Sequence, residues 1–151
     1  MISLRKVNEE NFLDIFGLQL KGGQEKYVSH PIRSLAQAYV YREQCQPLGI
    51  YDEDKLVGYV MVIYDYDIPE YDIRHMMIDG SEQGKGYGSA ALNCLIDYIR
   101  TKPFGNSNTV TLTCNKENET ALKLYCNAGF AKTGAEDEEE FELSRTVEES
   151  L

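Results

Sequence analysis

The chain has 151 residues, 42% of them hydrophobic and 26% charged, a composition typical of a globular protein rather than a disordered one. Its formal net charge of −10 repels nucleic-acid phosphates and anionic lipid, so we expect no nucleic-acid or membrane partner. The length suits a single domain, which we expect over residues 1–151. There is no apolar stretch of transmembrane length and no secretory signal, so we expect the protein in the cytoplasm.

The pattern of apolar residues predicts a mixed α/β domain built around one sheet. Helical spacing predicts helices at 9–20, 33–44, about 88–99 and 119–128, with Asn8 and Ser34 as N-caps of the first two. Alternating or continuous apolar residues predict strands at 2–7, 48–51, 56–64, 68–79 and 109–114, and two short strands within 130–145. The acidic run at 135–140 is predicted to be a solvated turn between those last two strands.

The cysteines and histidines argue against a metal site. The four cysteines are widely spaced and form no CxxC pair, and the chain has only two histidines. This pattern disfavours zinc and, in a cytoplasmic chain, disulfides. We therefore expect no metal cofactor.

A glycine-rich turn lies between the strand that ends at Asp79 and the helix that begins near Gly88. Bare backbone N–H groups and a helix N-terminus together favour binding of a phosphate group, and the Gln83 and Lys85 side chains can add contacts. The Walker A pattern fails after Lys85, and the dinucleotide-binding pattern fails at Ser89.

A third pattern, Q-x-x-G-x-G, fits the whole stretch from Gln83 to Gly88. Downstream, "NKENETALKLYCNAGF" has an Asn near a helix start, a Tyr further along the helix and then Gly-Phe. Together the two segments resemble the GNAT superfamily of acetyl-CoA-dependent N-acetyltransferases, and most closely its bacterial spermine/spermidine (diamine) branch. The resemblance implies an acyltransferase whose mixed, splayed sheet of about six to seven strands is flanked by about four helices.

The resemblance also implies which residues bind acetyl-CoA. The pantetheine arm is expected to pair with backbone groups of Met76, Met77 and Ile78 in the splayed opening, and Asn118 to hydrogen-bond to this arm. Tyr125 is the expected general acid, donating to the departing thiolate. The pyrophosphate is expected to bind across the turn formed by Gln83, Gly84, Lys85, Gly86, Tyr87, Gly88 and Ser89.

The general base is less clearly marked, because the carboxylate that related polyamine acetyltransferases often place before the turn is replaced here by "DIRHMM". His75 can titrate near neutral pH and relay a proton, although a purely structural histidine fits the strand equally well. Asp72, Glu70 and an ordered water stay open as alternatives.

Carboxylates and tyrosines gather where this family binds its acceptor. Glu25, Tyr27 and Asp72 are the expected substrate-binding residues, and they suit a polyamine with several ammonium groups. The same acidic residues also fit a merely solvated surface. A protein N-terminus or lysine, an amino acid or an aminoglycoside stays open as the acceptor, as does a non-catalytic acetyl-CoA-binding module. Family precedent adds a homodimer as an open alternative.

Overall fold

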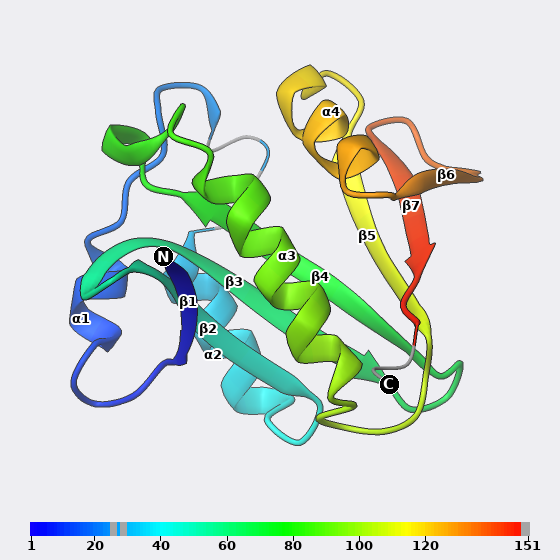
Figure 1. Ribbon diagram of the computed structural model, residues 1–151, viewed down its shortest axis with the longest axis horizontal. Helices are drawn as coiled ribbons and strands as arrows, with labels where there is room; N and C mark the ends of the chain where they lie inside the picture. The colour runs from blue at the N-terminus through cyan, green and yellow to red at the C-terminus, as the bar shows by residue number, and fades with distance from the viewer. Residues whose placement is uncertain (25–26, 28–29, 149–151) are drawn as a thin grey trace.

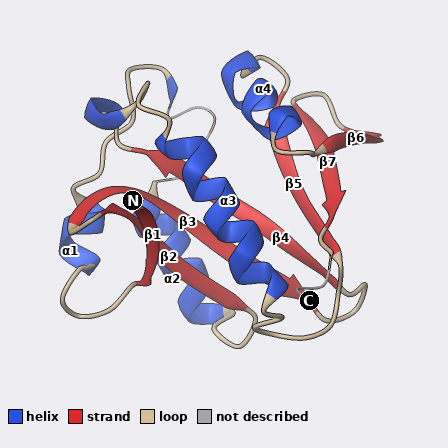
Figure 2. Cartoon of the chain, viewed as in Figure 1, coloured by secondary structure: helices blue, strands red, loops and turns tan. Residues whose placement is uncertain are grey.

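The computed structural model describes residues 1–24, 27 and 30–148 (Figure 1). In these ranges a seven-stranded mixed sheet carries helices on both of its faces (Figure 2), as the sequence predicts. The strands are β1 (Ile2–Lys6), β2 (Cys45–Asp52), β3 (Lys55–Asp65), β4 (Glu70–Ile78), β5 (Thr109–Asn115), β6 (Ala131–Glu136) and β7 (Glu140–Thr146). The helices are α1 (Phe12–Phe16), α2 (Pro31–Val40), α3 (Tyr87–Arg100) and α4 (Glu119–Asn127), and a short 3₁₀ helix spans Gly80–Glu82.

The strands lie in the order β1-β2-β3-β4-β5-β7-β6, and β4 and β5 form the one parallel pair described. This pair is joined only at Tyr71↔Val110 and Asp72↔Thr111. Beyond these positions β4 and β5 diverge, so that β5, β7, β6 and α4 stand apart from the rest of the sheet (Figure 1). The predicted splay in the sheet is confirmed. From Ile73 onward, the edge of β4 that faces β5 has no neighbouring strand among the described residues.

Each face of the sheet has its own core. The α3 side buries the predicted helical stripe of Ala91, Leu92, Leu95, Ile96 and Ile99 against β2–β5. The α1 and α2 side buries a smaller cluster that contains Ile15, Tyr59, Met61 and Met77. None of the helices in the described ranges combines the length and apolar character needed to span a membrane.

The two N-terminal helices differ from the sequence prediction. Helix α1 begins at Phe12 with Asn11 as its N-cap, so the cap predicted at Asn8 is wrong; Asn8 instead accepts the N–H groups of Glu10 and Asn11 in the turn before the helix. The helix ends at Phe16 instead of Leu20.

Helix α2 begins at Pro31, two residues earlier than predicted, and ends at Val40. Its N-cap is His30, whose Nδ1 accepts the Ile32 N–H at 3.1 Å. The cap predicted at Ser34 is therefore wrong, and Ser34 lies fully buried inside the helix.

Candidate active site

The glycine-rich turn connects the 3₁₀ helix after β4 to helix α3. Gly84 and Gly86 both have a φ of 82°, a left-handed conformation that a residue with a Cβ adopts only with strain. Gly86 is the N-cap of α3, and no side chain caps the helix. The N–H groups of the first helical turn are consequently left for an external acceptor, which is the arrangement that favours an anion.

The side chains of Gln83 and Lys85 have protein partners that hold the turn in shape. Gln83 donates to the Ile78 carbonyl at 2.9 Å and exchanges two amide hydrogen bonds with Gln24, at 2.8 and 3.1 Å. Lys85 donates to the buried carboxylate of Glu82 at 2.8 Å, and Lys55 pairs with the other oxygen of that carboxylate. Hydrogen bonds from these two lysines lower the pKa of Glu82.

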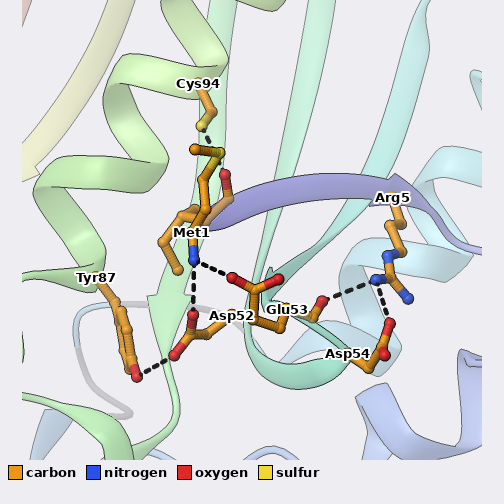
Figure 3. Close-up of polar contacts among 8 residues, drawn as sticks. Met1, Arg5, Asp52, Glu53, Asp54, Tyr87 and Cys94 are labelled. Carbon is orange, nitrogen blue, oxygen red and sulfur yellow. Dashed lines mark hydrogen bonds and ion pairs between the residues drawn. The ribbon is translucent and has the colours of Figure 1, made fainter.

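The first residue of α3 is fixed from the β2–β3 hairpin. The Tyr87 hydroxyl donates to Asp52 at 2.7 Å, and the second oxygen of Asp52 accepts from the Met1 amino group at 3.2 Å (Figure 3). Through Asp52, the start of α3 is tied to the end of β2. The phenol hydrogen of Tyr87 is therefore already donated to Asp52.

Two adjoining cavities follow the gap between β4 and β5. One, of about 810 Å³, is lined by the glycine turn, Met76, Met77, Ile78 and the start of α4. The other, of about 430 Å³, lies between β4 and the end of β5 and reaches the acidic turn before β7. Both cavities share the residues Tyr27, Met76, Asn118, Ala121 and Tyr125.

Helix α4 brings Asn118 and Tyr125 to this junction. Asn118 caps the helix by accepting the Ala121 N–H at 3.2 Å, which leaves its amide N–H₂ without a partner among the described residues. Tyr125 is half-buried, with its ring 6.3 Å from that of Phe130. Burial raises the pKa of Tyr125 to about 12, and no described residue hydrogen-bonds to its hydroxyl. This phenol is therefore protonated at neutral pH and can donate to a ligand.

His75 lies on a bulge of β4, where His75 and Met76 together face one residue of β3. Its φ is 58°, and the residue lines the smaller cavity. Nδ1 lies 2.8 Å from the Ser34 hydroxyl. Burial, and then the charges of Arg74 and Arg33, lower the pKa of His75, so the imidazole is neutral at neutral pH.

The residues expected to bind the acceptor are only partly brought together. Tyr27 lines both cavities, while Glu25 lies outside the described residues. Asp72 belongs to the lining of neither cavity; it accepts from Arg74 at 3.0 Å, and burial raises its pKa to about 6. In its place the smaller cavity has Glu139 and Glu140, which belong to the acidic run at 135–140 that the sequence predicts to be a merely solvated turn; Glu140 is in fact the first residue of β7.

The fold and the site together define an acetyltransferase. Residues 11–130 match the Acetyltransferase (GNAT) family, and the chain belongs to that family. It is accordingly an acyltransferase, as the paired glycine-turn and Asn118/Tyr125 segments suggest.

Among its relatives, the chain is 28% identical to the spermine/spermidine N(1)-acetyltransferase of Bacillus subtilis over 149 residues, covering 90% of this chain and 91% of that one. The fold is shared with the spermidine N-acetyltransferase of Vibrio cholerae in complex with CoA and spermine, at a TM-score of 0.79 and 20% identity over 97% of this chain and 95% of that one. It is also shared with an aminoglycoside acetyltransferase in complex with coenzyme A, at a TM-score of 0.78 and 15% identity over 97% and 95%.

Proposed function

We propose that this chain transfers the acetyl group of acetyl-CoA to a primary amine of a polyamine such as spermidine or spermine, by direct attack in a ternary complex. The observation that carries the proposal is the position of Tyr125. Tyr125 lines both cavities, one reaching the glycine turn and the other reaching a pair of carboxylates. A donor and an acceptor that entered from opposite ends would meet beside it.

The larger cavity suits the donor. The uncapped N-terminus of α3 offers N–H groups and the positive end of a helix dipole to a pyrophosphate across Gly84–Ser89. The unpaired edge of β4 at Met76–Ile78 can hydrogen-bond to an extended amide-containing arm, as a neighbouring strand would. The amide N–H₂ of Asn118 can donate to the same arm. The CoA complexes of the two structural neighbours support this assignment.

The junction supplies the groups that acetyl transfer needs. Attack of a neutral amine on a thioester breaks the C–S bond, and the phenol of Tyr125 donates its proton to the departing sulfur. Backbone N–H groups at Met76 and Met77 are proposed to stabilise the charge that develops on the carbonyl oxygen. His75, neutral at neutral pH, is proposed to accept the proton that the amine releases.

The smaller cavity suits a cationic acceptor. Glu139 and Glu140 offer carboxylates to ammonium groups, and Tyr27 offers a ring surface for methylenes or cations. The net charge of −10 attracts a polycation at long range. The Bacillus subtilis relative, matched along nine tenths of the chain, carries the name of a spermine/spermidine acetyltransferase.

A turnover screen tests the proposal. Acetyl-CoA is incubated with spermidine, spermine, short diamines, amino acids, an aminoglycoside and peptides with free N-termini, and both CoA and the acetylated product are quantified by mass spectrometry. We expect the highest kcat/KM for a polyamine. Preference for a different amine class would refute the polyamine assignment alone. Acetyl-CoA binding without turnover on every amine would refute the enzymatic proposal and favour a binding module.

A further inference from the structure

The hydroxyl of Ser34 joins three elements of the fold at one buried point. Ser34 on α2 and Tyr59 on β3 are both 0% exposed, and their oxygens lie 2.7 Å apart. The same Ser34 oxygen lies 2.8 Å from Nδ1 of His75 on β4 and donates to the Met61 sulfur at 3.6 Å. The hydroxyl therefore has three partners inside the protein.

The valence of the hydroxyl decides how the hydrogens are distributed. A serine hydroxyl has one hydrogen to donate and two lone pairs, so three partners use its full capacity. The thioether of Met61 has no hydrogen and can only accept, so it takes the Ser34 hydrogen. With the Ser34 hydrogen on Met61, the hydrogen count is completed when the two remaining partners donate to Ser34: Tyr59 through its O–H, and His75 through Nδ1–H.

The other ring nitrogen of His75 consequently has a free lone pair. Nε2 has no hydrogen-bond partner among the described residues. Every buried side-chain nitrogen or oxygen in those residues has such a partner, so Nε2 is not buried and is reached by solvent. His75 lines the smaller cavity, and so does Tyr125. A neutral imidazole in this tautomer can accept a proton at Nε2 with no rearrangement of the buried contacts.

We infer that Ser34 is a positioning residue, which holds His75 as the Nδ1–H tautomer and leaves the Nε2 lone pair open to the cavity. The inference rests on the proposed acetyl transfer, in which Nε2 receives the proton of the amine. Tyr59 and Met61 assist through Ser34, because each fixes one of its remaining bonding directions. Ser34 itself lines neither cavity and acts only through His75.

The tautomer can be measured directly by ¹⁵N NMR, since the chain has only two histidines. His30 is an internal reference of the opposite kind, because its Nδ1 accepts the Ile32 N–H and its hydrogen is therefore on Nε2. A His30→Gln variant assigns the two sets of signals. We expect His75 to carry its hydrogen on Nδ1 in the wild-type protein; a hydrogen on Nε2 would overturn the inference.

Two variants test the cause of the tautomer. Met61→Leu keeps the volume of a buried side chain but removes the sulfur acceptor, so the Ser34 hydrogen turns to His75 and the hydrogen of the ring moves to Nε2. Ser34→Ala removes the acceptor and yields a mixture of tautomers. His30 keeps its tautomer in both. An unchanged His75 tautomer in either variant would overturn the inference.

Kinetics test whether Ser34 acts through His75. We expect Ser34→Ala to lower kcat about tenfold while the KM for acetyl-CoA changes less than about twofold. In a His75→Gln background the same substitution should cost nothing further, and an additional tenfold loss would refute action through His75. Thr111→Val, which removes another buried hydroxyl, controls for general loss of packing. If the chain acetylates no amine, the proposed function fails, and the tautomer measurement still decides how Ser34 holds His75.

Discussion

Replacing Tyr125 with phenylalanine removes one hydroxyl and leaves the ring in place. No described residue hydrogen-bonds to that hydroxyl, and the ring keeps its edge-on contact with Phe130. We therefore expect the free energy of unfolding to change by less than about 0.5 kcal/mol. Loss of a general acid lowers rates by roughly 10² to 10⁴. Because the pKa of Tyr125 is raised to about 12, the phenol is a weak acid, and we expect the low end of that range.

The expected effect is a fall of about a hundredfold in kcat, equivalent to about 2.7 kcal/mol of transition-state stabilisation. The KM for acetyl-CoA should change by less than about twofold, since the backbone of the glycine turn is untouched. Initial rates with spermidine, followed by mass spectrometry of the acetylated product, give both constants, and thermal unfolding gives stability. Tyr98→Phe is the matched control, because Tyr98 is also a half-buried tyrosine on a helix but lies outside both cavities. Unchanged kcat in Tyr125→Phe, or an equal fall in Tyr98→Phe, would refute the role given to this phenol.

Three further variants address the donor end, the acceptor end and the closed part of the sheet. Gly86→Ala forces a residue with a Cβ into a φ of 82°, so we expect it to cost about 1–2 kcal/mol of stability and to raise the KM for acetyl-CoA. Gly134→Ala, at a φ of 95° on β6, is the control and should lose stability without a change in this KM. Replacing both Glu139 and Glu140 with glutamine should raise the KM for spermidine about fivefold, as expected for two solvent-accessible charge contacts. An unchanged KM would exclude both residues from the acceptor site. Glu9→Gln, at an exposed carboxylate outside the cavities, is the control and should have no effect. Asp72 binds its proton more tightly in the folded protein, since burial raises its pKa from 3.8 to about 6, so the free energy of unfolding should decline as pH rises through that window. Asp72→Asn should remove this part of the decline in denaturant titrations at several pH values, and an identical pH dependence in the variant would contradict the shift.

Local pattern was enough to predict the strands, helix α3 and the glycine turn, because each depends on neighbours in the sequence. It failed at Ser34, since a serine ahead of an apolar stripe fits an N-cap as well as a helix interior. The His30-Pro31 pair is the local signal that the prediction overlooked, because proline suits the first turn of a helix.

Contacts between distant segments were outside the reach of local pattern. Glu140 reaches the cavity because β7 pairs with β5 in a register that sets it opposite Asn115. The link from Ser34 to His75 likewise joins residues 41 positions apart. Neither arrangement follows from composition or periodicity, and the acidic run at 135–140 therefore looked like an ordinary solvated turn.

The two-pair seam between β4 and β5 also has a consequence for local opening of the native state. Within the described ranges, backbone hydrogen bonds join the unit of β5, β7 and β6 to the remaining strands only at the closed end of the gap. This unit should therefore exchange its amide hydrogens through its own partial unfolding. A ligand that binds both sides of the gap opposes such opening by an amount that grows with the logarithm of its concentration. Deuterium uptake in β5 and β7, compared with uptake in β2 and β3, would then serve as a gauge of how fully the gap is occupied.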